Sequence, residues 1–192
     1  MTTWWWVRHA PTHEAGFVGW RDVTADLSDA DQMARLSAYL PGDGVIVSSD
    51  LRRAVATADV IEQGRERLPH AAKLREFNFG DWDGLTFGQV AARDAELSRA
   101  YWEAPGDTAP PNGESWNDVA ARLAAFVGPM NARFAGRNII AVAHIGVIMT
   151  QIQVAGSLSA AQAVAHKIDN YSVTRLHWHG DGWSIGAINH LA

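Results

Sequence analysis

Cysteine is absent from this sequence of 192 residues. Its absence excludes disulfide bonds, a thiolate nucleophile and thiolate metal ligands. A chain without cysteine also fits a reducing compartment. We therefore expect a cytoplasmic protein whose chemistry uses other side chains.

Positive charge is also scarce, with 16 Lys and Arg against 21 Asp and Glu and a net charge of -5. Surfaces that bind nucleic acid normally carry an excess of basic residues, so we expect no nucleic-acid partner. Long apolar runs are missing too. The run at residues 4–7 is far too short to cross a bilayer or to serve as a signal sequence, and we expect no membrane partner.

What the sequence does contain is a globular balance of 47% hydrophobic and 19% charged residues. A chain of this length most simply forms one domain, here residues 1–192. We expect buried strands at 4–7, 45–47 and 138–143, helices at 30–40, 51–64, 87–102, 116–134 and 146–156, and a terminal hairpin at 171–189. This alternation predicts an α/β fold, with helices on both faces of a mostly parallel sheet in three layers.

Local signals refine these elements. Ser49 or Asp50 could cap the helix at 51–64, and Gly64 and Gly156 would end their helices. Gly128-Pro129 predicts a kink or a break within 116–134. The segment 104–113 is rich in Pro and Gly and predicts a loop.

Charged and imidazole side chains follow the predicted strands. Arg8 and His9 end the first strand, His144 ends the third, and Arg53 opens the helix after the second. Ligands of parallel sheets bind beyond the carboxyl ends of the strands, so these groups are predicted to converge. Glu76 lies in a further motif, KLREFNFGDWDG. Each residue alone has an ordinary structural explanation, and it is their convergence that favours a site.

Such a cluster suits a phosphoryl group, because guanidinium groups bind its oxygens in pairs. A neutral imidazole could attack phosphorus, and the cations would stabilise the charge of the transition state. A carboxyl group could protonate the leaving alcohol and then activate water.

The sequence at these positions resembles the histidine phosphatase superfamily, which has the phosphoglycerate mutase-like fold. VRHAPT is similar to its Arg-His-Gly-x-Thr signature, and SSDLRRAVATA is similar to its Ser-x-x-x-Arg-Ala-x-x-Thr-Ala segment. LREFNFGDWDGLT, PNGESW and IIAVAHIGVI resemble further motifs, in the family's order, between residues 4 and 150.

The resemblance implies roles for particular residues. His9 would be the nucleophile and Glu76 the proton donor, while Arg8, Arg53 and His144 would bind the phosphate. The main-chain N–H of Ile145 would be a further phosphate donor. The resemblance also implies that the phosphatase branch uses no metal and no organic cofactor.

Three positions depart from the family's pattern. Ala10 replaces the usual glycine after the nucleophile, and Ala15 stands where a phosphate-contacting asparagine is common. Ile145 replaces the common glycine after the second histidine. None of these changes removes a charged participant.

Thr12, Trp20 and Arg21 lie in or after the first motif and are candidate substrate contacts. His13 follows His9 by four residues, but in a strand followed by a loop, which is not a helical metal-binding spacing. His177 and His179 would share a strand face without a third ligand, and we expect a structural or surface role for them.

We therefore expect a phosphomonoesterase acting on a small phosphorylated metabolite, with an α-ribazole-phosphate phosphatase as one specific form. Two alternatives remain: a bisphosphoglycerate-dependent mutase, and a non-catalytic phosphate-binding module that regulates a partner. A homodimer is also left open.

Overall fold

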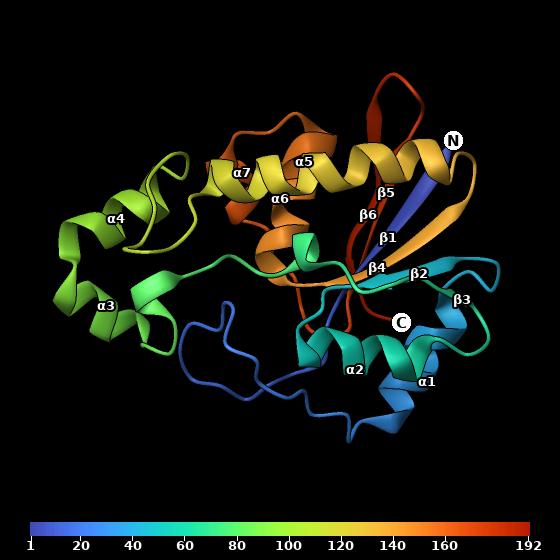
Figure 1. Ribbon diagram of the computed structural model, residues 1–192, viewed down its shortest axis with the longest axis horizontal. Helices are drawn as coiled ribbons and strands as arrows, with labels where there is room; N and C mark the ends of the chain where they lie inside the picture. Colours follow the sequence, from blue (N-terminus) through green and yellow to red (C-terminus); the bar gives the residue numbers. More distant parts are fainter.

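The computed structural model describes residues 1–192 and contains one six-stranded sheet, with the strand order β3-β2-β4-β1-β5-β6 (Figure 1). The strands are β1 (Thr2–Arg8), β2 (Val45–Ser48), β3 (Glu66–Arg67), β4 (Asn138–Ala143), β5 (Val173–Trp178) and β6 (Trp183–His190). Strands β1 to β4 pair in parallel, and β5 pairs antiparallel with both β1 and β6. The predicted mostly parallel sheet and the terminal hairpin are therefore confirmed.

Helices cover both faces of the sheet, which confirms the three-layer α/β/α arrangement. One face packs against α1 (Ala30–Tyr39) and α2 (Arg52–Ile61), and the other against α5 (Trp116–Arg133), α6 (Ile145–Gly156) and α7 (Ala160–Val164). In Figure 1, α5 lies above the sheet, and α1 and α2 lie below it. None of these helices has both the length and the apolar character needed to cross a bilayer.

The three tryptophans of β1 pack against the helices on both faces of the sheet. Trp4 and Trp6 are fully buried on the α5 side, where their rings stack with centroids 4.9 Å apart. Trp5 and Val7 alternate onto the α1–α2 side, as the pleat of a strand requires. The Trp4 indole N–H also donates to Asn131 Oδ1 of α5 at 2.8 Å. These contacts hold β1 from both sides, so its carboxyl end is rigidly placed.

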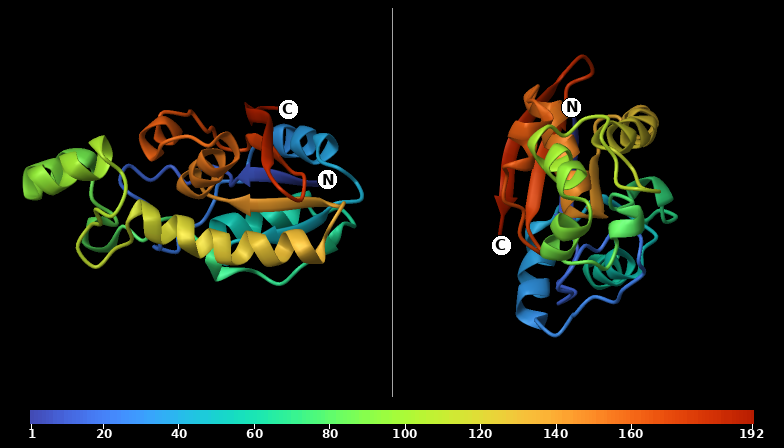
Figure 2. Two further views of the ribbon diagram at one scale, coloured as in Figure 1. Left: turned by 90° about the horizontal axis from the view of Figure 1, so that it is seen from above. Right: turned by 90° about the vertical axis from the view of Figure 1, so that its left-hand side faces the viewer.

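The expected helix at 87–102 is two helices, α3 (Phe87–Arg93) and α4 (Ala95–Glu103). Asp94 interrupts them with a non-helical backbone, and its carboxylate accepts a hydrogen bond from the Trp82 indole at 2.7 Å. This buried anchor competes with the helical conformation at Asp94. Both helices extend past the carboxyl ends of the parallel strands (Figure 2).

The break considered at Gly128-Pro129 does not occur, because α5 runs without interruption from Trp116 to Arg133. Pro129 has no N–H to donate to the carbonyl of Ala125, four residues earlier. The Lys73 ammonium donates to that carbonyl instead, at 3.4 Å. Burial of Val127 and Met130 on either side of the proline favours the continuous helix.

The start of α2 also differs from the expectation. Leu51 is the N-cap residue and makes no side-chain cap. Asp50 turns away to Arg75, with N–O distances of 2.8 and 2.6 Å, and Asp22 accepts from the Arg52 N–H at 2.7 Å instead. A distant loop therefore supplies the acceptor that a local cap usually provides.

The helix ends depart slightly from the expected positions. Helix α2 ends at Ile61, and Gly64 takes a positive φ in the turn beyond it. Gly156 is the last residue of α6, and the left-handed position falls on Ser157.

Candidate active site

Arg8 and His9 are held at the carboxyl end of β1 by main-chain hydrogen bonds to both flanking segments. The Arg8 N–H donates to the Ser172 carbonyl and the His9 N–H to the Ala143 carbonyl, each at 3.1 Å. His144 directly follows Ala143 at the end of β4, the parallel neighbour of β1. Two adjacent strands thus bring the two histidines to one edge of the sheet, with ring centroids 5.1 Å apart.

The ring of His9 is almost completely buried, and its hydrogen bonds define its tautomer. Nδ1 lies 2.6 Å from the carbonyl oxygen of Ala10. A carbonyl can only accept, so Nδ1 carries the proton and Nε2 is left with its lone pair. Burial, together with the nearby guanidinium groups of Arg53 and Arg8, lowers the pKa of His9 to about 3. At neutral pH, His9 is therefore an uncharged imidazole with an unprotonated Nε2.

Arg53 lies in the first turn of α2 and is 1% exposed. Its Nε donates to His9 Nε2 at 3.3 Å, while Nη1 and Nη2 donate to the carbonyls of Arg21 and Gly19 at 3.0 and 2.7 Å. Desolvation lowers the pKa of Arg53, and the nearby carboxylate of Glu76 opposes this effect. The guanidinium is thus fixed directly beside the free nitrogen of His9.

Arg8 brings a second guanidinium to the same place. Its Nη1 donates to the Ile168 carbonyl at 2.6 Å, whereas its Nε is buried without a hydrogen-bond partner in the protein. Burial lowers the pKa of Arg8, and the charge of Glu76 partly offsets this. A buried cation with an unused donor is costly unless an anion binds beside it.

His144 is fully buried, and neither of its ring nitrogens has a hydrogen-bond partner in the protein. Desolvation, followed by the charge of Arg53, lowers the pKa of His144 well below its usual value, so the ring is neutral. The ring nitrogens of His144, like Nε of Arg8, therefore lack the hydrogen bond that a buried polar atom normally makes.

Glu76 is 4% exposed, and backbone donors hold its carboxyl group. Phe77 N–H donates to Oε1 at 3.0 Å and Gly146 N–H to Oε2 at 3.2 Å. Burial raises the pKa of Glu76 above its usual value, against the opposing effects of these donors and the two arginines. Glu76 therefore keeps its proton to a higher pH than an exposed glutamate does, which suits a general acid.

Gly146 is a residue that the sequence reasoning missed. A Cβ at this position would lie 2.5 Å from both Glu76 Oε1 and a ring carbon of Phe77. Only glycine lets the first turn of α6 approach the carboxyl group this closely. The signal in the sequence is the glycine of the motif HIGVI, which directly follows Ile145, the position where the family often has glycine.

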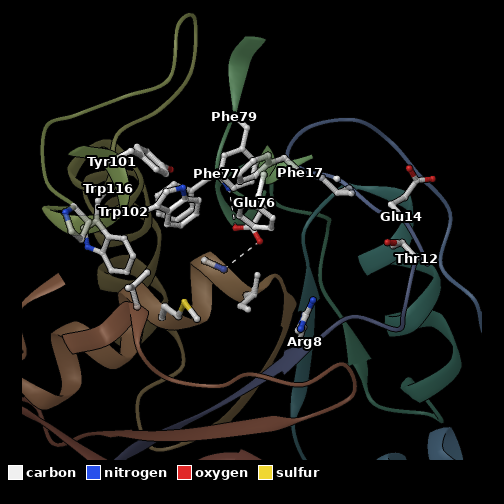
Figure 3. Close-up of a pocket in the computed structure, with 18 of the residues that line it drawn as sticks. Arg8, Thr12, Glu14, Phe17, Glu76, Phe77, Phe79, Tyr101, Trp102 and Trp116 are labelled. Atoms are coloured by element: carbon white, nitrogen blue, oxygen red, sulfur yellow. Dashed lines mark hydrogen bonds between the residues drawn. The ribbon is translucent and has the colours of Figure 1, made fainter. Parts of the chain in front are cut away.

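A cavity of about 420 Å³ opens onto this cluster. Its lining includes Arg8, His9 and Glu76, and Figure 3 shows Thr12 and Glu14 on the other side of Arg8 from Tyr101, Trp102 and Trp116. Most of the remaining lining is an aromatic wall, which consists of Phe17, Phe77, Phe79, Phe87, Tyr101, Trp102 and Trp116. Figure 3 shows Tyr101, Trp102 and Trp116 on the side away from Thr12 and Glu14, while Phe17 lies nearer to Glu14.

The other predicted site residues take different places. Ile145 lines the cavity, whereas Arg53 and His144 are buried beside His9, outside the lining. Trp20 and Arg21 are also outside it. The Trp20 indole donates to the Glu76 carbonyl at 2.8 Å, and Arg21 pairs with Asp83 and Glu14. The predicted contact of Trp20 and Arg21 with substrate is therefore not supported by their position, because their polar groups are already engaged.

Ala10 and Ala15, two of the positions that depart from the family's pattern, differ in burial. Ala10 is fully buried, and its N–H donates to Thr57 Oγ1 at 2.9 Å, while Ala15 is exposed. His13 pairs with Asp26 at 2.8 Å.

The two histidines at the hairpin make local hydrogen bonds. His177 bonds Thr3 Oγ1 at 3.1 Å, and His179 bonds Ser184 Oγ at 2.8 Å.

The model of the histidine phosphatase superfamily (branch 1) matches residues 4–191. The chain belongs to this superfamily. Its fold agrees, since the structure superposes on Bacillus stearothermophilus YhfR with a TM-score of 0.90, at 25% identity over 100% of this chain and 98% of that one. A mycobacterial glucosyl-3-phosphoglycerate phosphatase structure gives a TM-score of 0.86, at 29% identity over 99% of both chains.

Sequence relatives of this histidine phosphatase carry several names. The glucosyl-3-phosphoglycerate phosphatase of Mycobacterium tuberculosis is 33% identical over 74% of both chains. The adenosylcobalamin/alpha-ribazole phosphatase of Salmonella typhimurium is 30% identical over 75% of this chain and 74% of its own. A bifunctional protein of Mycobacterium tuberculosis is 33% identical over 87% of this chain, which spans only 44% of that longer protein.

The close approach at Gly146 predicts the effect of a single methyl group. Gly146→Ala should destabilise the protein by about 1–3 kcal/mol, because the methyl displaces Glu76 or Phe77. Gly88→Ala is the matched control, since nothing lies within 4 Å of its added Cβ in α3. It should stabilise the helix by about 0.5–1 kcal/mol. Urea denaturation measures both, and a Gly146→Ala protein as stable as the wild type would contradict the tight contact.

The lowered pKa of His9 predicts how stability depends on pH. The unfolded histidine gains a proton below about pH 6.5 and the folded one only near pH 3, so its contribution is present above 6.5 and is lost as the pH falls. In this window, His9→Gln should flatten the dependence of the unfolding free energy by up to about 1.4 kcal/mol per pH unit. Urea titrations at pH 7, 6 and 5 test this, and parallel curves for the two proteins would contradict a buried neutral His9.

Proposed function

We propose that this histidine phosphatase hydrolyses phosphate monoesters of small molecules through a phosphohistidine on His9. The observation that carries the proposal is the state of the His9 ring. Its Nδ1 proton is held by the Ala10 carbonyl, and its bare Nε2 lies 3.3 Å from the Arg53 guanidinium, at the end of a cavity that also reaches Arg8 and Glu76.

Binding of the phosphate group would exchange one hydrogen bond for another. Arg53 Nε donates to His9 Nε2 in the free protein. A phosphate oxygen carries far more negative charge than a neutral imidazole, so it takes over this donor and frees the lone pair of Nε2. The unpartnered Nε of Arg8 and a ring N–H of His144 supply further donors. The N–H of Ile145, at the start of α6, has the favourable position of a helix N-terminus.

Transfer then proceeds in two balanced steps. His9 Nε2 attacks phosphorus, the bond from phosphorus to the ester oxygen breaks, and the carboxyl group of Glu76 gives its proton to the leaving alcohol. Water next attacks the phosphohistidine, Glu76 accepts a proton from it, and the N–P bond breaks to release inorganic phosphate. Arg8 and Arg53 balance the charge on the transferred group in both steps.

The cavity supports hydrolysis more than the mutase, while the relatives include both phosphatases and a bisphosphoglycerate-dependent phosphoglycerate mutase of Methylobacterium radiotolerans. Two relatives are named phosphatases of small phosphorylated molecules, and an α-ribazole phosphate remains a specific candidate. A mutase that uses a bisphosphorylated cofactor needs cations for a second phosphate, and Arg8 is the only cationic arginine or lysine in the lining. The retained His9 and Glu76 argue against a non-catalytic module. A homodimer and a cytoplasmic location stay predictions.

Detection of a phosphohistidine on the protein tests the proposal directly. Brief incubation with a ³²P-labelled aryl phosphate should label the protein with an acid-labile, base-stable group, and inorganic phosphate should accumulate. His9→Ala should take up no label. His13→Ala should still be labelled, because His13 is exposed and pairs with Asp26 away from the ring of His9. An unlabelled wild type without turnover would contradict the proposal, and transfer to an added phosphate acceptor instead of water would favour the mutase.

The role of Glu76 predicts a dependence on the leaving group. Glu76→Gln keeps the shape but cannot give up a proton, so kcat/KM for alkyl phosphates, which reports the transfer to His9, should fall about 10²–10⁴-fold. The loss should be much smaller for 4-nitrophenyl phosphate, because nitrophenolate leaves without protonation. In the wild type, kcat/KM should fall as rising pH ionises Glu76, at a pH above the usual carboxyl range because burial raises its pKa. This fall should be absent in Glu76→Gln, and equal losses on both substrates would contradict its role as the acid.

A further inference from the structure

The two ends of the cavity differ sharply in charge. Arg8 is the only arginine or lysine among the lining residues, and it precedes His9 at the carboxyl end of β1. Arg21 is nearby, but it pairs with Glu14 at 3.1 Å and with Asp83 at 3.2 Å, so its charge is already balanced. Apart from Arg8, which would bind the phosphate, the lining of the cavity therefore offers no arginine or lysine to a second anionic group of a substrate.

The aromatic wall is continuous from the cavity interior to its rim. The ring of Phe17 lies 4.4 Å from that of Phe87, 4.9 Å from that of Phe79, and nearly parallel to Trp102 at 5.9 Å. Phe77 extends the wall to Trp116, with centroids 5.6 Å apart. These rings present a wide apolar surface of the kind that binds planar or bulky apolar groups.

Phe87 is the member of the wall that points most clearly to a ligand. It is 63% exposed although it lines the cavity, and it lies on α3, beyond the carboxyl ends of the strands. An exposed aromatic ring at the rim of an apolar cavity gains free energy when an apolar ligand covers it.

A carboxylate on the alcohol of the substrate would bind unfavourably in this cavity. Against the aromatic wall it would lose its hydration without gaining a partner. On the other side of the cavity it would approach Glu14, which shares the single cation Arg21 with Asp83, so that these three groups keep a net negative charge. Both walls thus disfavour an alcohol with its own negative charge.

We propose that the preferred substrates are monoesters whose alcohol is an uncharged aromatic or bulky apolar group, and that alcohols with a carboxylate or second phosphate are discriminated against. This inference rests on the proposed phosphatase function and specifies its substrate class. It also separates this chain from its relative named glucosyl-3-phosphoglycerate phosphatase, because a glycerate carries a carboxylate.

Substrates with alkyl alcohols test the inference without a large difference in leaving-group reactivity. Benzyl phosphate and 2-phenylethyl phosphate represent the favoured class, and 3-phosphoglycerate and 2-phosphoglycolate, whose alcohols carry a carboxylate, the disfavoured one. Burial of one phenyl group should raise kcat/KM of the favoured esters about 30-fold or more above 3-phosphoglycerate.

Variants show whether the wall causes the preference. In the double variant Phe87→Ala/Trp102→Ala, the kcat/KM for 2-phenylethyl phosphate divided by that for 3-phosphoglycerate should fall at least about tenfold. Inhibition by inorganic phosphate should change little, because it reports on the phosphate end. Phe87→Leu should keep most of the ratio, and Val60→Ala, on the exposed side of α2, should keep all of it. Glu14→Gln should raise kcat/KM for 3-phosphoglycerate selectively.

The two levels of the proposal fail in different ways. Turnover of 3-phosphoglycerate equal to that of the phenyl esters, or a ratio that the double variant leaves unchanged, would overturn the substrate class while the phosphatase function stands. Absence of turnover with every ester, together with no phosphohistidine, would overturn the function itself.

Discussion

The bare Nε2 of His9 beside the guanidinium of Arg53 is the interaction on which the rest of the site depends. It exists because Ala10 holds the proton on the opposite nitrogen and because both side chains are buried, so that the imidazole stays neutral. Water around the ring would restore its ordinary pKa, and a mobile guanidinium would leave the ring without its electrostatic partner. The site is therefore built from burial as much as from residue identity.

The surrounding structure keeps these groups in place. Stacked tryptophans and two layers of helices hold β1, while parallel pairing with β4 brings His144 beside His9. The carbonyls of Gly19 and Arg21 accept hydrogen bonds from Arg53. The N–H of Gly146 donates to Glu76, and the space between these two residues is too small for a side chain at position 146. A rigid sheet edge thus fixes the reacting end of the cavity, while α3 and α4 contribute Phe87 and Trp102 to the other end.

Much of the sheet could be predicted from the sequence, because short apolar runs rich in β-branched and aromatic residues have few other stable conformations. The errors occurred where a distant partner outweighed a local preference. Asp94 divides an expected helix where the Trp82 indole bonds its carboxylate, and α5 continues through Pro129, where Val127 and Met130 are buried against the core and Lys73 donates to the carbonyl that proline leaves free. At the start of α2, Asp22 supplies the acceptor expected from Ser49 or Asp50.

The sequence by itself determined most of the strands and helices, though not β3, α7 or the division of α3 from α4, and it placed Arg8, His9 and His144 at strand ends, since these follow from local composition and the rule for parallel sheets. It also carried the family motifs. Only the tertiary structure decided the tautomer of His9, the close approach of Gly146 to Glu76, and the separation of the cavity into a charged end and an aromatic wall. These features depend on distances between residues far apart in the chain, and no local pattern encodes such distances.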